Sequence, residues 1–382
     1  MTQSNTKPMS WIGNLLLILG GIVTAILILE TFAITTGFTI NDYFEITHKY
    51  FYEFLQPNDK LGYIPQPNLS NFNYYWSYEA KDAVINTDNN GFRNLGRDYA
   101  DSNLYFVGDS FTWGWGIDRE KTFYGILESE LNHPTITLGI PGYGFEQYQV
   151  LFKEWVSKYK PKTVILCLYA NDLEAVKPLE EMKKTYQILG AAEYETLDWY
   201  QKSLIYKFII KKGLLNLLKM LFTAKEARNG LILHNQRYMT YQLVGTSRDY
   251  LGSADRIQVE NALSQIIDIT QENQIDLLIF CIPTKESTYI EEYAQLFPRR
   301  IDYMRNYLRN EEVGYQQLCQ LAQEKKVPCV DLTKAFREKS GEAKLYFNLD
   351  SHWNVAGHQL AAKLISETLV RLRKTGLGER NG

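Results

Sequence analysis

Four short segments of this 382-residue sequence contain the residue types that nucleophilic acyl transfer requires. They read GDSF at 108–111, GIPGYG at 139–144, YAND at 169–172 and DSHWN at 350–354. Acyl transfer through a hydroxyl needs a nucleophile, an imidazole that takes its proton and a carboxylate that orients the imidazole. It also needs hydrogen-bond donors for the oxyanion that develops on the substrate. The four segments together offer a candidate for each of these roles.

Ser110 is the candidate nucleophile because it follows an apolar run, at a predicted strand-to-helix turn that exposes its hydroxyl. His352 is the candidate base and Asp350 its carboxylate partner. Two residues apart in an extended loop, their side chains point the same way. The candidate oxyanion donors are the backbone N–H groups of Ser110 and Gly142, where no side chain blocks a ligand, and the side-chain amide of Asn171.

Each of these residues also has a purely structural interpretation when it is taken alone. Ser110 is a residue type that caps helices, Gly142 one that forms turns and Asn171 one that caps or turns the backbone. The alternative base is His358, but it lies inside a helical pattern and no acid precedes it by two or three residues. The joint occurrence of the candidates, in this order, favours the catalytic interpretation with His352 as the base.

Short apolar runs alternate with helical patterns from residue 104 onward. The predicted strands are residues 104–108, 135–139, 163–169, 276–282 and 327–332. The predicted helices are residues 122–131, 145–158, 258–271, 313–325 and 355–373. This alternation predicts a parallel sheet covered by helices on both faces, in which sites form at the carboxyl ends of the strands. The candidate residues follow such strand ends or precede the last helix, so we expect them to meet at one edge.

The motifs that carry chemistry resemble those of the SGNH (GDSL-type) hydrolase superfamily. They are Gly108-Asp109-Ser110, then Gly142, then Asn171-Asp172, then Asp350 with His352. The resemblance covers residues 104–373 and implies a flavodoxin-like three-layer α/β/α sandwich with strand order 2-1-3-4-5. It implies Ser110 as the nucleophile, Gly142 and Asn171 as completing the oxyanion hole, and His352 with Asp350 as base and partner.

The sequence departs from the usual superfamily pattern at three places. Tyr169 stands where many members have Gly, and Thr137 where many have Asn. The acid and the histidine are separated by one residue rather than two, which resembles polysaccharide O-acetylation proteins of the alginate type with their DxHW-like string. A tyrosine at position 169 narrows the expected pocket and favours a small acyl group.

Residues 11–34 are apolar except for a single charge at Glu30. At about 1.5 Å per residue, a helix of this length extends for roughly 36 Å, enough to cross a hydrocarbon core of about 30 Å. We therefore predict a retained single-pass transmembrane anchor. A cleaved signal peptide and a buried core helix are the alternatives. Lys7 before the span, with mixed charges after it, favours a cytoplasmic N-terminus and a catalytic domain outside the cytoplasm.

The predicted organisation has a tail at each end. It runs as an N-terminal tail (1–10), the anchor (11–34), a turn-rich connector that packs on the main domain (35–100), a catalytic domain (101–375) with an inserted segment (173–255), and a C-terminal tail (376–382). The insertion contains an apolar run with lysines at helical spacing, residues 203–222. We favour a helical cap beside the site, since inserted segments commonly form lids; an amphipathic helix on the membrane is the alternative.

The composition excludes several function classes. With 41 basic and 44 acidic residues the net charge is −3, which argues against a nucleic-acid partner. The four cysteines have no CxxC or Cys/His zinc spacing and are too scattered for a disulfide scaffold, so no metal and no organic cofactor are predicted. The sequence predicts an esterase that removes acyl, in particular acetyl, groups from extracytoplasmic carbohydrate or another small ester. An O-acetyltransferase with the same triad and a non-enzymatic glycan-binding scaffold are the alternatives.

Overall fold

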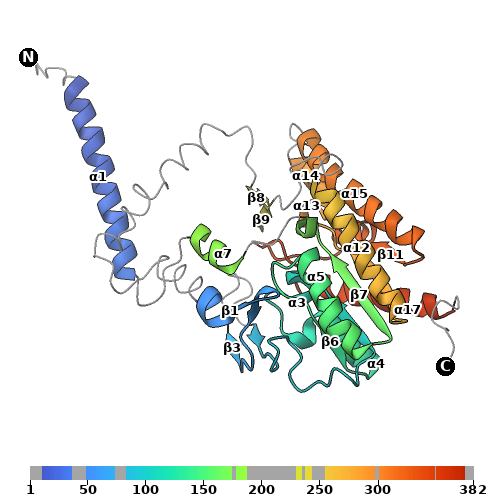
Figure 1. Ribbon diagram of the computed structural model, residues 1–382. Coiled ribbons are helices and arrows are strands. Elements are labelled where there is room, and N and C mark those ends of the chain that lie inside the picture. Colours follow the sequence, from blue (N-terminus) through green and yellow to red (C-terminus); the bar gives the residue numbers. More distant parts are fainter. Residues whose placement is uncertain are drawn as a thin grey trace, which may run out of the picture. The chain divides into compact units, whose positions relative to one another are not determined.

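The computed structural model describes residues 11–36, 49–73, 83–173, 178–186, 229–234, 237–242, 254–296, 301–348 and 350–374 (Figure 1). The chain divides into two compact units. One contains Met1–Lys49 and Tyr186–Ala227, and the other contains Tyr50–Thr185 and Arg228–Gly382. The candidate catalytic residues all belong to the second unit.

The first unit contains helix α1, which spans Trp11–Thr36 and therefore includes the predicted apolar segment. Among the described residues, no helix meets the combined length and apolar content of a membrane span. Membrane anchoring by residues 11–34 stays a prediction.

The second unit is built on a five-stranded parallel sheet. Its strands are β5 (Leu104–Val107), β6 (Thr135–Thr137), β7 (Thr163–Leu168), β10 (Asp276–Cys281) and β11 (Cys329–Asp331). Their order in the sheet is β11-β10-β7-β5-β6, which is 2-1-3-4-5 in chain order and confirms the predicted order. Every residue of β5 and β6 is buried, as continuous burial between two helical layers requires.

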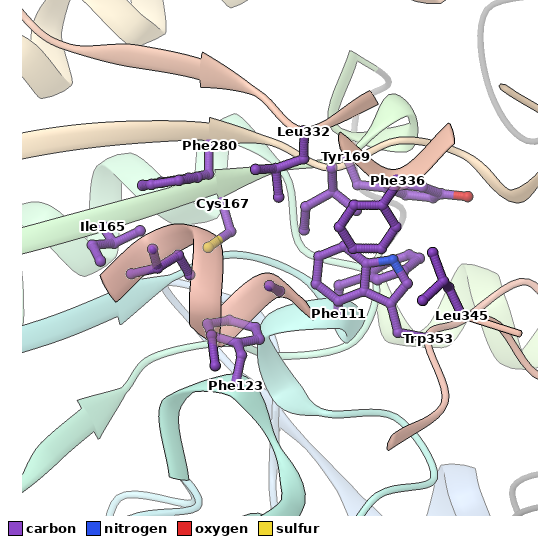
Figure 2. Close-up of a cluster of buried hydrophobic side chains, with 14 of the residues drawn as sticks. Phe111, Phe123, Ile165, Cys167, Tyr169, Phe280, Leu332, Phe336, Leu345 and Trp353 are labelled. Carbon is purple, nitrogen blue, oxygen red and sulfur yellow. The ribbon is translucent and has the colours of Figure 1, made fainter. Parts of the chain in front are cut away.

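Helices cover both faces of this sheet, as predicted (Figure 1). The main ones are α4 (Phe123–Leu131), α5 (Phe145–Leu151), α12 (Ala254–Glu272), α15 (Ile301–Glu324), α16 (Thr333–Ser340) and α17 (Val355–Lys374). Helices α4, α16 and α17 pack on one face, where Phe106 and Ile165 of the strands meet Phe123 and Phe336. Figure 2 shows this cluster, which continues to Trp353 in the candidate catalytic loop. Helix α12 contacts β10, α5 and α15, and α15 contacts β11, which gives the third layer.

Two predicted helices differ in extent from those observed. The predicted helix at 145–158 is α5 followed by a π-helical turn, Phe152–Val156, and a last helical turn, Ser157–Tyr159. The predicted helix at 313–325 is the end of the much longer α15. The first turns of α15 carry Ile301, Met304 and Leu308 at helical spacing, a signal that the prediction of residues 313–325 did not include.

The predicted connector contains short elements that pack on the sheet. They are a π-helical turn (Lys49–Phe54), β1 (Leu55–Asn58) paired with β2 (Gly62–Pro65), and β3 (Phe72–Asn73) paired with β4 (Val84–Ile85). The side-chain amide of Asn94 pairs with the backbone of Thr137, giving and accepting one hydrogen bond of 2.9 Å each. The Asn94 amide therefore supplies the hydrogen bonds that a further strand would make at the edge of β6.

The inserted segment is described only in part. It begins at the end of a 3-10 turn (Ala170–Leu173). Its described elements are helix α7 (Leu179–Tyr186) and the antiparallel strands β8 (Asn229–His234) and β9 (Arg237–Gln242). The apolar run at 203–222 lies outside the described residues, so both its cap interpretation and its membrane-surface interpretation stay predictions.

One disulfide joins Cys319 of α15 to Cys329 of β11. The sulfur of Cys281, on the neighbouring strand β10, lies 4.0 Å from both of these sulfurs. A single disulfide inside an ordinary core is consistent with the expectation that the cysteines do not form a scaffold, although the sequence spacing did not identify the pair.

Candidate active site

Ser110 is the first residue of α3 (Ser110–Trp113), a single helical turn that directly follows β5. Asp109 caps this helix, because its Oδ1 accepts the Phe111 backbone N–H at 2.9 Å. Gly108 makes the tight turn possible. A Cβ atom there would lie 2.2 Å from Thr112 Oγ1 and 2.8 Å from the carbonyl oxygen of Cys167. The chain therefore turns sharply at the strand end and carries Ser110 at the sheet edge.

The structure brings Ser110, His352 and Asp350 together. Ser110 Oγ lies 2.7 Å from His352 Nε2, and His352 Nδ1 lies 2.5 Å from Asp350 Oδ1. The same Oδ1 also accepts the His352 backbone N–H at 2.8 Å. A carboxylate can only accept from Nδ1, so the proton sits on Nδ1 and leaves Nε2 free to accept the proton of Ser110. The Asp-x-His spacing is thus compatible with a linear acid–base relay.

The charge state of Asp350 supports the same relay. Burial raises the pKa of its carboxyl, but the charge of His352 and the hydrogen bonds from the His352 ring and backbone outweigh this. The net result is a pKa below the usual range for aspartate. The His352 and Asp350 side chains are 18% and 16% exposed, so the pair is open enough to be reached from solvent.

Aromatic rings fix the orientation of the imidazole. Trp115 stacks on His352 at a centroid distance of 5.1 Å and an interplanar angle of 19°. Phe111 lies 4.9 Å from the same ring. Trp353, the residue after the histidine, is buried in the core cluster against Phe111 and Phe336, as Figure 2 shows. The tryptophan of the DxHW-like string therefore anchors the loop that carries the base.

Gly142 occupies the third position of a type II turn over residues 140–143. The Tyr143 N–H donates to the Ile140 carbonyl at 3.2 Å, proline precedes the glycine, and the Gly142 φ is +79°. Gly142 is exposed. The backbone N–H groups of Gly142 and Ser110 donate no hydrogen bond to any described residue. Both N–H groups thus remain available to an oxyanion.

Asn171 lies in the 3-10 turn that follows β7. Its side chain hydrogen-bonds to the Asp109 carboxyl beside the nucleophile. An amide nitrogen carries two N–H groups, so one bond to Asp109 leaves a second donor. Within the described chain the Asn171 Oδ1 has no hydrogen-bond partner. The structure therefore places Asn171 next to the Ser110 turn, as its predicted role requires.

Two buried carboxyls, Asp109 and Asp172, hold these strand ends in place. Asp172 accepts the Tyr148 hydroxyl and the Tyr169 backbone N–H, each at 2.7 Å. Burial raises the pKa of both carboxyls, and the neighbouring charge of Asp109 raises that of Asp172 further. Asp109 also lies beside the relay, because its Oδ2 is 3.3 Å from the Ser110 hydroxyl, whereas Asp172 bonds only to Tyr148 and to the backbone of Tyr169 among the described residues. We assign both carboxyls a structural part in shaping the turn that carries Ser110.

His358 does not contact Ser110. It lies on the buried side of α17 with 1% exposure, and its Nδ1 accepts the Phe123 backbone N–H at 3.3 Å. Burial, aided by the charges of Arg93 and His352, lowers the pKa of its imidazole to about 3. The ring therefore stays neutral at physiological pH and links α17 to the start of α4. The geometry favours His352 as the base.

Among the described residues, three cysteines lie close enough together to be considered as metal ligands. They are Cys281, Cys319 and Cys329. Two of its sulfurs are bonded to each other, so the cluster does not offer three thiolates. It lies apart from the relay formed by Ser110, His352 and Asp350.

Comparison with known proteins was made by sequence and by structure. The sequence model of the GDSL-like lipase/acylhydrolase family matches residues 106–360, more than half of the chain. No curated protein matches the chain by sequence.

Similar solved structures have low identity to this chain. The acetyl xylan esterase AlAXEase is 15% identical, with a TM-score of 0.36, and the match covers 69% of this chain and 98% of that one. A GDSL-like lipase from Bacteroides thetaiotaomicron is 13% identical, with a TM-score of 0.38 and coverage of 72% and 91%. An acetylxylan esterase from Geobacillus stearothermophilus, solved as a catalytic mutant, is 16% identical, with a TM-score of 0.35 and coverage of 69% and 92%. At these values the likenesses do not define a substrate for this chain.

Proposed function

Because the chain belongs to the GDSL-like lipase/acylhydrolase family, we propose that it is a serine-dependent hydrolase that removes short acyl groups, in particular acetyl, from O-acylated carbohydrate. One observation carries this proposal. Ser110 Oγ, the His352 ring and the Asp350 carboxylate form an unbroken relay with separations of 2.7 and 2.5 Å. A binding module has no need for these three residues in this arrangement, so the geometry supports an enzyme over a glycan-binding scaffold.

The relay accounts for both halves of ester hydrolysis. His352 Nε2 takes the Ser110 proton as Oγ attacks the ester carbonyl carbon, and Asp350 stabilises the imidazolium that results. The imidazolium then gives this proton to the departing alcohol oxygen as the carbon–oxygen bond breaks, leaving an acyl-serine. In the second half His352 takes a proton from water, the hydroxide attacks the acyl carbon, and the proton returns to Ser110 Oγ as the acid leaves.

The oxyanion that forms in each half needs hydrogen-bond donors. The candidates are the N–H groups of Ser110 and Gly142 and the side-chain amide of Asn171, which follow the ends of β5, β6 and β7. Donors of this kind act mainly on the transition state, because charge on the oxygen is largest there. We therefore assign the three residues to an oxyanion hole.

The surroundings of Ser110 support a short acyl group. Phe111 follows the nucleophile and lies 4.4 Å from the ring of Tyr169, while Trp115 covers the imidazole. Phe111 and Tyr169 are buried. Because Phe111 adjoins the nucleophile and packs on Tyr169, and Trp115 covers the base, we infer that the site takes a short acyl group. A series of aryl esters with acyl chains of two, four and eight carbons tests this directly, and faster cleavage of the longest chain would contradict it.

Covalent labelling of the nucleophile tests the proposed chemistry. A fluorophosphonate reacts with an activated serine, and we expect the label to map to Ser110 by peptide mass spectrometry. The Ser110→Ala variant should fold but neither label nor hydrolyse aryl acetate. Near-parental turnover in this variant would refute the assignment. Adding an oligosaccharide acceptor to the same assay separates hydrolysis from O-acetyl transfer, since a transferase moves the acetyl to the sugar in preference to water.

We further propose that the catalytic domain works outside the cytoplasm, tethered by residues 11–34. Two observations support this location. The segment is apolar with one charge, and the disulfide Cys319–Cys329 is of a kind that persists in oxidising compartments. If the segment is an anchor, the protein stays in the membrane fraction after a wash at high pH. Complete release of the full-length chain by alkali would contradict it.

A further inference from the structure

Lys285 is a buried lysine close to the catalytic loop. It is the first residue of α13 (Lys285–Thr288), a few residues beyond the end of β10, and it is 1% exposed. The backbone at this point is firmly held. The Thr284 N–H and hydroxyl donate to the buried Glu311 carboxyl at 3.1 and 2.7 Å, and Thr284 Oγ1 caps α13 by accepting the Ser287 N–H. The base of the lysine side chain is therefore fixed in space.

The ammonium of Lys285 donates to three backbone carbonyls of one loop. The Nζ lies 2.7 Å from the Phe347 oxygen, 2.8 Å from that of Asn348 and 3.2 Å from that of Asp350. An ammonium has three N–H donors, and a buried charge is tolerated when it is hydrogen-bonded in this way. Without the cation, three carbonyl dipoles would converge with their negative ends facing one another.

This loop carries the acid–base half of the relay. Its two ends are joined by the Phe347 N–H, which donates to the His352 carbonyl at 3.0 Å, and by a bridge between Tyr346 and Trp353. The ends are thus fixed by the backbone and by the buried tryptophan. The tip, which includes Asp350, is held by Lys285.

We propose that Lys285 is a positioning residue, whose ammonium holds the backbone carbonyls of Phe347, Asn348 and Asp350 so that Asp350 and His352 stay aligned with Ser110. This inference rests on the proposed serine hydrolase function. It adds a residue that contacts neither the substrate nor the reacting atoms. Burial raises the pKa of Asp350, and the charge of Lys285 joins His352 in lowering it, so the clamp also favours the ionised carboxylate.

The experiment counts active sites as well as activity. In Lys285→Met the side chain keeps an unbranched stem, one atom shorter, and loses the three donors. We expect kcat on aryl acetate to fall by about 10²-fold, because misplacement of a catalytic group by about 1 Å is sufficient for such a loss. KM should change by less than about threefold, since the lysine does not touch the substrate.

Fluorophosphonate labelling separates positioning from folding. If Lys285 positions the loop, nearly all folded molecules still label at Ser110 in the end, but the rate constant per site falls together with kcat. If its role is merely structural, the labelled fraction falls and the remaining sites react at the parental rate, which would overturn the proposal.

Lys344→Met is the matched control. Lys344 Nζ reaches the same loop but donates to the side-chain Oδ1 of Asn348 at 2.6 Å, and to no backbone carbonyl of Phe347, Asn348 or Asp350. Its per-site rate should stay within about twofold of the parent. If Lys285→Met does not fold, Lys285→Arg decides, because a planar guanidinium cannot bring one nitrogen to three carbonyls and we expect a per-site loss of about tenfold.

The outcomes also separate the two levels of inference. A parent protein that neither labels at Ser110 nor hydrolyses aryl acetate refutes the proposed function. A parent that does both, with folded Lys285 variants whose per-site rates stay within twofold of it, refutes the clamp alone.

Discussion

Substitution of Gly142 by alanine perturbs the oxyanion turn in two separable ways. The residue has a φ of +79°, a conformation that strains any residue with a Cβ atom, by about 1–2 kcal/mol. The added Cβ would also lie 2.6 Å from the Tyr63 hydroxyl, which is fully buried and donates to the Pro141 carbonyl at 2.8 Å. The turn can relieve this contact only by moving the tyrosine and breaking its hydrogen bond.

The magnitude follows from these two contributions. Loss of a buried hydrogen bond that leaves a carbonyl without a partner costs about 1–3 kcal/mol. Gly142→Ala should therefore reduce the free energy of unfolding by about 2–5 kcal/mol. Tyr63→Phe alone should cost about 1–3 kcal/mol, since it removes the same bond. In the double variant the clash is absent because the hydroxyl is gone, so its stability should match that of Gly142→Ala rather than the sum of the two losses.

Urea denaturation of the three variants measures this coupling, and kcat on aryl acetate reports the oxyanion hole in the same samples. We expect an interaction energy of about 1–3 kcal/mol, with the double variant more stable than additivity allows. We also expect kcat to fall by roughly 10²–10³ in Gly142→Ala, as the loss of one oxyanion donor predicts. Strictly additive losses would refute the contact between Tyr63 and the turn, and an unchanged kcat would refute the role of the Gly142 N–H.

Three further predictions concern the relay and its surroundings. His352→Ala should impair turnover nearly as much as Ser110→Ala, because the two act as a unit; retention of activity with loss only in His358→Ala would reverse the assignment of the base. Asn171→Ala should lower kcat by roughly 10²–10³ with little change in KM, and a rise in KM alone would make it a substrate-binding residue. The pKa of buried His358 is about 3, below its ordinary value of about 6.5, so protons bind the unfolded chain more readily. The contribution of neutral His358 to the free energy of unfolding is fully present above pH 6.5. It is lost as pH falls towards 3, by about 2 kcal/mol at pH 5. His358→Gln should remove this pH dependence of the free energy of unfolding, measured by denaturation at several pH values.

Much of the fold could be predicted because buried strands leave a plain signal. The runs that form β5, β7 and β10 are continuous and apolar, and the helical patterns between them indicate crossover connections. The strand order itself came from resemblance and not from periodicity. The beginning of α15 was not predicted, although Ile301, Met304 and Leu308 stand at helical spacing along it.

The relay could also be predicted from residue types and spacing, because Ser110, His352 and Asp350 lie where strand ends and a late loop converge. The residues that support it could not. Tyr63 holds the oxyanion turn from 78 positions away, and Lys285 holds the loop tip from 65 positions before Asp350. Neither belongs to the four segments that carry the candidate catalytic residues, and a hydrogen bond to a backbone carbonyl places no demand on the residue type of its partner. Only the folded structure identifies such contacts.

The turn at Gly142 and the loop that carries Asp350 and His352 are held in place by different parts of the chain. The oxyanion turn is held by the connector, through Tyr63 and through the amide of Asn94 at the edge of β6. The loop that carries Asp350 and His352 is held from the opposite side of β5, by Lys285 after β10 and by the burial of Trp353. Ser110 lies between them, on a helical turn that both halves must meet within hydrogen-bonding distance. Phe111, which follows Ser110, packs against Tyr169 on one side and against His352 and Trp353 on the other, and so joins the two halves. On the proposed function, the buried strands β5, β7 and β10 would serve catalysis as well as stability, because they fix the positions from which both halves reach Ser110.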